Sequence, residues 1–93
     1  MKLTSLSADL EGRAPYDVYA DLLRVLVEEP DITQTKLAMK TNLDTRGIAR
    51  YLEILLRTQL VLRQARGNRH IFQITERGRE FMQQYKELTS MIE

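Results

Sequence analysis

The chain has 93 residues, of which 43% are hydrophobic and 29% are charged, and its formal net charge is +1. This length allows one domain, which buries a little over about 60% of the surface of its unfolded chain. The absence of cysteine excludes disulfides, thiolate zinc sites and cysteine nucleophiles. No apolar run approaches the ~20 residues of a membrane span, and the N-terminus lacks the basic and then apolar pattern of a secretory signal. We therefore expect a cytoplasmic protein with no membrane partner.

The charges are distributed unevenly along the chain. Residues 33–70 contain eight Lys or Arg and only two acids, a net charge of +6, whereas residues 1–32 carry −4 and residues 71–93 carry −1. The near-zero total therefore conceals one strongly basic segment. A segment of this kind is the electrostatic footprint of a nucleic-acid-binding protein.

The first third of the chain is expected to contain one clear helix. Residues 1–14 are compatible with a short helix, a strand or an extended arm. The clear helix begins at Pro15, whose missing N–H costs nothing in a first turn. It ends near Glu28, because Pro30 forces the residue before it out of helical geometry. Between these limits, apolar residues recur at helical spacing at Tyr19, Leu22, Leu23 and Leu26.

Two further helices, separated by a polar turn, are expected next. Thr33 can cap the first by accepting a hydrogen bond from an unsatisfied N–H, and Asn42 can adopt the left-handed conformation that ends it. Asp44 then caps the second helix. Ile32, just before them, fits either a short strand or a core contact. The residues expected to face inward are Leu37 and Ala38 in the first helix and Ile48, Tyr51, Leu52 and Leu55 in the second.

A β-hairpin follows the helices. The runs Val61–Arg66 and His70–Ile74 are short, and Gly67-Asn68 between them suits the positive φ angles of a tight turn. Phe72 and Ile74 share one face of their strand and should pack on the helices.

A last helix is expected after Thr75, which caps it. Its apolar residues alternate in steps of four and three, at Phe81, Tyr85, Leu88 and Ile92. Phe81 can pack on the first helix, which leaves the distal residues without an obvious partner in one chain. Since an exposed apolar patch usually marks an interface, we predict a symmetric dimer built on this helix.

The pattern as a whole resembles the winged helix-turn-helix family. The residues that look like its core are Leu37-Ala38, Leu43, Ile48, Leu52, Leu55 and Leu60-Val61, and the run that resembles its wing end is Ile74-Thr75-Glu76-Arg77-Gly78. A narrower resemblance, to small archaeal winged-helix DNA-binding proteins, rests on Asn42-Leu43, Arg50-Tyr51-Leu52, Leu55 and the arginines of the hairpin. Gln59 stands where the family usually has glycine.

The resemblance implies a mainly α fold with a small β-hairpin. Residues 15–75 would form the winged helix-turn-helix, residues 76–93 a C-terminal dimerisation helix, and residues 1–14 an N-terminal arm of unclear structure. The implied function is duplex DNA binding, as a transcriptional regulator or a chromatin-type protein associated with the nucleoid. The alternative is a protein-interaction adaptor that uses the same fold within a larger assembly.

In a helix-turn-helix, the N-terminal part of the second helix reaches base edges. The outward residues that we predict to contact DNA there are Thr45, Arg46, Ala49, Arg50 and Arg57. Arg46 and Arg50 are the best candidates for guanine contacts, because the planar guanidinium matches the O6 and N7 acceptors. The alternative is a solvated helix face in which Glu53 pairs with the arginines beside it.

Phosphate and wing contacts complete the predicted site. The phosphate contacts are Thr33, Thr35, Lys36 and Lys40. The wing contacts, suited to a narrow minor groove, are Arg63, Arg66, Asn68 and Arg69; charged residues there can also protect edge strands from aggregation. His70, the only histidine, is expected near phosphate or solvent. The sequence predicts no catalytic set, metal site, cofactor or small-molecule ligand.

Overall fold

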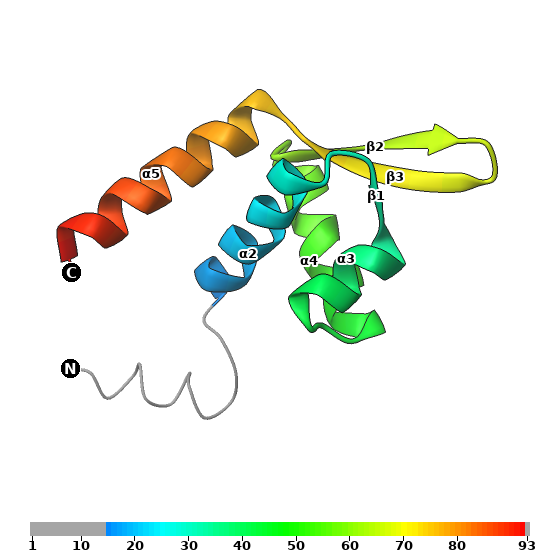
Figure 1. The fold of residues 1–93 in the computed structure, drawn as a ribbon, viewed down its shortest axis with the longest axis horizontal. Helices are drawn as coiled ribbons and strands as arrows, with labels where there is room; N and C mark the ends of the chain where they lie inside the picture. Colours follow the sequence, from blue (N-terminus) through cyan, green and yellow to red (C-terminus); the bar gives the residue numbers. More distant parts are fainter. Residues whose placement is uncertain (1–14, 93) are drawn as a thin grey trace.

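The computed structural model describes residues 15–92 (Figure 1). Its elements, in chain order, are α2 (Pro15–Glu28), β1 (Ile32–Thr33), α3 (Gln34–Thr41), α4 (Thr45–Arg57), β2 (Val61–Arg66), β3 (Arg69–Ile74) and α5 (Glu76–Ile92). The predicted mainly α fold with a small hairpin is confirmed. In Figure 1 the β2–β3 hairpin extends to one side of α2, α3 and α4, and α5 extends to the opposite side. The predictions for residues 1–14 lie outside the described residues.

The caps expected from the sequence are formed at both central helices. Thr33 Oγ1 accepts a hydrogen bond from the Lys36 N–H at 3.3 Å, and Asp44 Oδ1 accepts one from the Gly47 N–H at 2.7 Å. Asn42 ends α3 in the left-handed conformation, with a φ of 62°. Each cap satisfies backbone groups that a helix end leaves without a partner. Local side chains therefore fix the turn between α3 and α4.

One hydrophobic core joins the helices to the base of the hairpin. α4 contributes Ile48, Leu52 and Leu55, each at most 3% exposed, while Tyr51 on the same stripe is half-buried. The other members of the buried cluster are Val18, Leu22, Leu23, Leu26, Ile32, Leu37, Val61 and Phe72. Burying one such aliphatic or aromatic side chain stabilises a fold by about 1.5–3 kcal/mol, so this cluster dominates the stability of the domain.

β1 adds a third strand to the hairpin, and the antiparallel sheet has the order β1-β3-β2. Ile32 pairs with Phe72, and Thr33 pairs with Ile71. Because directly opposed side chains lie on the same face of a sheet, Ile32 and Phe72 enter the core together. Ile32 therefore belongs to a short strand and also contacts the core. Ile71 is also buried, on the other face of β3, which the sequence pattern did not predict.

A tight junction connects the end of α4 to the start of α5. Gln59 adopts the left-handed conformation, with a φ of 67°. The Thr75 hydroxyl donates to the Gln59 carbonyl oxygen at 2.7 Å, and it accepts from the Gly78 N–H at 3.0 Å. A Cβ atom on Gly78 would lie 2.3 Å from the Leu60 carbonyl oxygen. In the Ile-Thr-x-x-Gly run, the threonine thus supplies the hydrogen bonds of this junction, and the glycine allows the two backbones to approach closely.

Five aromatic rings connect α4, α2 and the first half of α5. The ring centroids are 5.4 Å apart for Tyr51 and Tyr19, and 6.0 Å apart for Tyr19 and Tyr16. The series continues with centroid distances of 6.4 Å from Tyr16 to Phe81 and from Phe81 to Tyr85. Aromatic pairs at such distances stabilise by about 0.5–1.5 kcal/mol beyond their burial. The first half of α5 is therefore held against the helix-turn-helix.

Candidate nucleic-acid interface

The outer face of α4 carries a basic stripe. Its orientation is fixed by the buried Ile48, Leu52 and Leu55 on the opposite side. The outward side chains are all exposed: Thr45, Arg46, Ala49, Arg50, Glu53 and Arg57. The helical spacing that directs three aliphatic side chains into the core therefore directs three guanidinium groups and one carboxylate toward solvent.

The arginines of this stripe have no partner among the described residues. Within residues 15–92, the side chains of Arg46, Arg50 and Arg57 form no hydrogen bond or ion pair, and Glu53 forms none either. The intrahelical pairs that would neutralise the stripe are therefore not formed. Like charges four residues apart destabilise a helix by about 0.2–0.5 kcal/mol, and an external anion would relieve this repulsion.

The lysines of α3 are paired, in contrast. Lys40 Nζ lies 2.6 Å from Glu29 Oε2, and Lys36 Nζ lies 4.0 Å from Glu29 Oε1. The hydrogen bond between Lys40 and Glu29 lowers the pKa of the carboxyl and raises the pKa of the ammonium group. Thr33 and Thr35, the other predicted phosphate contacts, lie at the start of α3, where Thr33 caps the helix and Thr35 is exposed.

A cleft of about 500 Å³ separates the start of α3 from the hairpin. It is lined by Thr33, Gln34, Thr35, Arg63, Arg69, His70 and Phe72. Arg63, Arg69 and His70 are exposed, and their side chains have no hydrogen-bond or ion-pair partner in the described part of the chain. The structure thus brings together residues that were predicted separately as phosphate and wing contacts. Two cations beside a helix N-terminus favour an oxyanion, because the helix dipole acts in the same direction.

Near the tip of the hairpin, in contrast to the cleft, the arginine side chain has an ion-pair partner. Asn68 is exposed in the turn, where Gly67 takes a φ of 64°. Arg66 Nη1 lies 3.6 Å from Asp31 Oδ2, and the other oxygen of that carboxylate accepts from Gln73 Nε2 at 2.8 Å. Arg66 is therefore held by the segment between α2 and β1, unlike the other two arginines of the hairpin.

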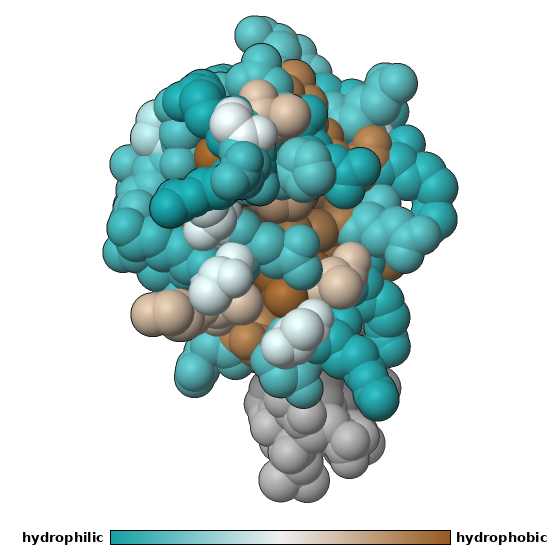
Figure 2. All heavy atoms as spheres, turned by 90° about the vertical axis from the view of Figure 1, so that its right-hand side faces the viewer, coloured by the Kyte–Doolittle hydropathy of each residue, from teal (hydrophilic) through white to brown (hydrophobic). Residues whose placement is uncertain are grey.

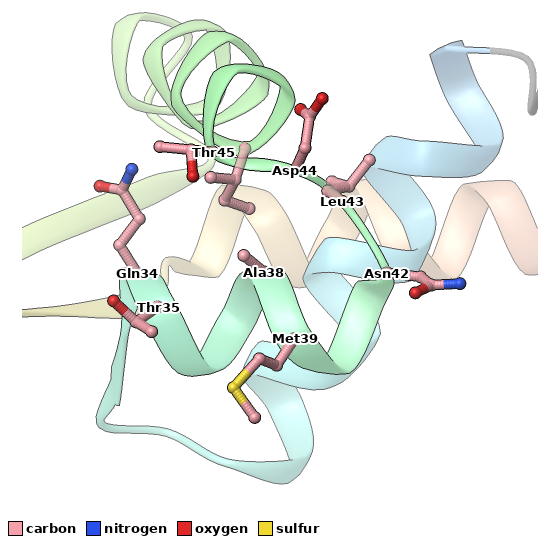
Figure 3. A pocket seen from close by; sticks show the side chains of 9 residues that line it. Gln34, Thr35, Ala38, Met39, Asn42, Leu43, Asp44 and Thr45 are labelled. Carbon is pink, nitrogen blue, oxygen red and sulfur yellow. The ribbon is translucent and has the colours of Figure 1, made fainter.

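A second hollow, of about 830 Å³, lies between α3 and α4. Figure 3 shows Gln34 and Thr45 at one end of it, Asn42 toward the other end and Met39 on α3 between them. Gln34 lines both this hollow and the cleft, and Met39 is 72% exposed. Neither is among the predicted site residues. Because Gln34 directly follows the cap Thr33, the cap itself was the signal that could have placed it at this end of α3.

The face of the molecule on the hairpin side is shown in Figure 2. Hydrophilic residues cover most of it, and hydrophobic residues lie in a hollow near its centre. Such a surface suits a DNA groove, in which phosphates flank base edges and thymine methyl groups.

Two absences hold for the part of the chain that the structure describes. Residues 15–92 contain no helix with both the length and the apolar character needed to cross a membrane. Among the same residues, no three His, Cys, Asp or Glu side chains are grouped closely enough to hold a metal ion.

The model of the family described as winged helix-turn-helix matches residues 12–93. The chain belongs to the winged helix-turn-helix family. No curated protein matches it. Accordingly, α3 and α4 are the helix-turn-helix, and β2 and β3 form the wing.

Solved structures with this fold come from archaea and bacteria. Sso10a-2, a DNA-binding protein from Sulfolobus solfataricus, is 22% identical with a TM-score of 0.76, covering 85% of this chain and 81% of that one. The PcaV transcriptional regulator from Streptomyces coelicolor, in complex with its natural ligand, is 25% identical with a TM-score of 0.67, covering 70% and 48%. The oxidised form of MarR from E. coli is 21% identical with a TM-score of 0.70, covering 75% and 52%. The chain thus spans about half the length of PcaV and MarR.

The face of α5 that was predicted to form a dimer consists of Phe81, Tyr85, Leu88 and Ile92. Its first half is occupied within the chain, because Phe81 packs against the core and the Tyr85 hydroxyl donates a hydrogen bond to Asp17. That bond raises the pKa of Tyr85. The distal part is open, with Leu88 57% exposed and the neighbouring Met91 81% exposed. The side chain of Ile92 lies outside the described residues.

Proposed function

We propose that this winged helix-turn-helix protein binds duplex DNA through α4 and the wing, as a transcriptional regulator or a chromatin-type protein. The observation that carries the proposal is a set of five exposed arginines that have no partner among residues 15–92: Arg46, Arg50, Arg57, Arg63 and Arg69. Gln34 and Thr35 line the hollow beside α4 as well as the cleft beside the wing, so the start of α3 borders both. Cations that the protein does not neutralise are available to neutralise phosphates, with release of counterions.

In this proposal, the first half of α4 enters the major groove. Arg46 and Arg50 donate to guanine O6 and N7. The Thr45 hydroxyl contacts a base or a phosphate, and the small side chain of Ala49 leaves room for the base edges. Arg57, at the far end of the helix, contacts the backbone.

The cleft between α3 and the wing would hold a phosphate of the DNA backbone. Arg63 and Arg69 supply charge on one side of it, and the Thr35 hydroxyl supplies a donor on the other. The wing tip at Asn68 then lies beside the minor groove, whose negative potential attracts arginine. This arrangement clamps one strand between the helix-turn-helix and the wing.

A second copy of the chain is the partner that we propose for the distal end of α5. Leu88 and Met91 are exposed there and apolar, and contiguous apolar surface usually marks an interface. A two-fold dimer would present two copies of α4 to half-sites about one helical turn of DNA apart.

Similarity to proteins described as DNA-binding and as transcriptional regulators supports the proposal. The ligand of PcaV is not carried over to this chain, which covers 48% of PcaV. The proposal includes no cofactor, metal, small-molecule ligand or catalytic activity, and it places the protein with the DNA of the nucleoid.

The test is fluorescence anisotropy with a random-sequence duplex, titrated at several salt concentrations. The wild type is expected to bind with micromolar or tighter affinity at low salt, and the logarithm of its affinity should fall by about 0.9 per phosphate contact for each tenfold rise in salt. Arg46→Ala/Arg50→Ala should weaken binding at least tenfold and reduce the salt slope by about 2.

Arg77→Ala/Arg79→Ala is the matched control, since it removes the same charge from exposed positions on α5. Its effect on affinity should be small by comparison. If the wild type does not bind DNA at low salt, or if both double variants weaken binding equally, α4 is not the DNA-contacting helix. The adaptor function would then be favoured, with a protein partner at the exposed end of α5.

A further inference from the structure

The short turn between α2 and β1 holds three of the eight basic residues of segment 33–70. We refer to Glu29, Pro30 and Asp31 as the acidic turn. Glu29 lies 2.6 Å from Lys40 and 4.0 Å from Lys36, and Asp31 lies 3.6 Å from Arg66. These three cations belong to different elements, two to α3 and one to the wing. All the other basic residues of the segment lack an internal ion-pair partner within residues 15–92.

The acidic turn places carboxylate oxygens where phosphate oxygens would lie. A Lys–carboxylate contact of 2.6 Å has the length of a charge-assisted hydrogen bond, which is also how lysine contacts a phosphate. Three cations beside two carboxylates retain a net charge of only +1, so this side of the molecule attracts DNA weakly. A phosphate that approaches the lysines of α3 also meets the negative charge of the acidic turn.

The geometry of the turn is maintained by the rest of the fold. Pro30 restricts the backbone of the turn, and Asp31 Oδ1 accepts from Gln73 Nε2 at 2.8 Å, which attaches the turn to β3. β1 follows immediately and pairs with β3. The two carboxylates are therefore held near their partners by the sheet as well as by the ion pairs themselves.

We propose that the acidic turn is an internal competitor of the DNA backbone for Lys36, Lys40 and Arg66. It confines strong DNA contact to the unpaired arginines of α4 and the wing, and it lowers the affinity for DNA of any sequence. Glu29 and Asp31 are thus positioning residues that act through the cations. The inference rests on the proposed function and states which cations of the basic segment contribute least to it.

The ion pairs of the acidic turn are weak enough for DNA to displace them. All three pairs are partly exposed, with side-chain exposures between 34% and 59%. Exposed pairs of this kind are weak and are screened by salt. DNA can therefore displace the carboxylates where its backbone reaches α3, at the expense of part of its affinity.

The test compares amide variants, which remove the charge and keep the shape and the acceptor oxygen. Glu29→Gln/Asp31→Asn is titrated with the same random-sequence duplex as the wild type, at several salt concentrations. The variant is expected to bind about tenfold more tightly at about 0.1 M salt, with a salt slope steeper by about 2, because freed cations add phosphate contacts. Glu76→Gln/Glu80→Gln removes the same number of charges from exposed positions on α5 that form no ion pair within residues 15–92, so it should alter affinity less than about twofold.

A double-mutant cycle shows whether Glu29 acts through its lysine. Glu29→Gln should tighten binding in the wild type and have a smaller effect once Lys40→Gln is present, because only the more distant Lys36 is then left for Glu29 to compete for. A merely structural role of the turn would instead appear as a loss of thermal stability in Glu29→Gln, followed by circular dichroism, with no change in the salt slope.

The outcomes separate the two proposals. If the wild type binds DNA but the amide double variant binds no more tightly, or if Glu76→Gln/Glu80→Gln has the same effect, the competition is disproved and the proposed function stands. If the wild type binds DNA only at low salt and the variant still binds at salt concentrations at which the wild type no longer does, the competition is supported. If none of the proteins binds DNA, the proposed function fails.

Discussion

The α4–α5 junction differs from the basic surface of α4 and the wing in whether its polar groups find partners within the chain. At the junction, the Thr75 hydroxyl both donates and accepts, and the Gly78 backbone is in contact with the Leu60 carbonyl. On the basic surface, Arg46 and Arg50 have no partner among the described residues. The first region is determined by contacts within the chain. The second consists of exposed charges that the described part of the chain does not neutralise, and the proposed DNA contact rests on this observation.

This difference predicts that substitutions in the two regions have separable effects. Changes at the junction should alter the free energy of unfolding, and changes on the basic surface should alter DNA affinity alone. A protein that evolves for binding can leave charges unpaired on its surface because exposed arginines contribute little to stability.

The largest effect on stability is expected from Gly78→Ala. A Cβ atom there would lie 2.3 Å from the Leu60 carbonyl oxygen and 2.6 Å from Ile74 Cγ1. Neither neighbour can move without disturbing the junction, so we expect a loss of at least about 3 kcal/mol. In thermal unfolding followed by circular dichroism, Tm should fall by more than about 12 °C.

Gly67→Ala is the control for this substitution. Gly67 has a φ of 64°, and no atom lies within 4 Å of the position of its Cβ. Only backbone strain is introduced there, with a cost of about 1–2 kcal/mol. If the two alanine variants are equally stable, the close approach at Gly78 is not the reason for glycine at that position.

Thr75→Val should have the next largest effect. The substitution keeps the shape but removes the donor to the Gln59 carbonyl and the acceptor for the Gly78 N–H. Loss of a helix cap and one further hydrogen bond is expected to destabilise by about 1–2 kcal/mol in urea unfolding. Thr89→Val removes a hydroxyl that donates to the Tyr85 and Lys86 carbonyls within the same helix, and it should cost less than about 0.5 kcal/mol. Similar losses for both would contradict the cap.

Gln59→Gly tests the same junction in the opposite direction. Gln59 has a φ of 67° at the position where glycine is usual in the family. Glycine removes left-handed strain but adds freedom to the unfolded chain, so we expect a net gain of about 0.5–1 kcal/mol. Gln64→Gly in β2, where φ is not positive, should instead lose a similar amount. Destabilisation by Gln59→Gly would show that the glutamine side chain supports the junction.

The sequence predicted those parts of the fold that depend on local chemistry. The caps at Thr33 and Asp44 and the left-handed Asn42 are each formed by neighbouring residues, and all three are confirmed. The buried stripe of α4 follows from helical periodicity alone. The hairpin followed from the turn signal at Gly67-Asn68 between two short strand-like runs, and the family resemblance added its interpretation as a wing.

The remaining features depend on contacts between distant segments. The burial of Ile71 requires β1 to pair with β3, and β1 has only two residues. The pairing of Glu29 with Lys40 requires the α2–β1 turn to pack beside α3. A run of acids just before a basic segment was visible in the sequence, but only the fold determines which cations it meets. The predicted DNA contacts and the dimer face stay predictions.

The smallest effect on stability is expected from Arg46→Ala/Arg50→Ala, the variant that should lose DNA affinity. Both side chains are exposed and have no partner within residues 15–92, and they repel each other at i and i+4. In urea unfolding without DNA, the free energy of unfolding should change by less than about 0.5 kcal/mol, and alanine can even stabilise the helix. A loss above about 1.5 kcal/mol would mean that the arginines support the fold. The α4–α5 junction, whose polar groups are paired within the chain, and the basic surface would then no longer differ in their effect on stability. The main reason to place DNA on α4 would be lost.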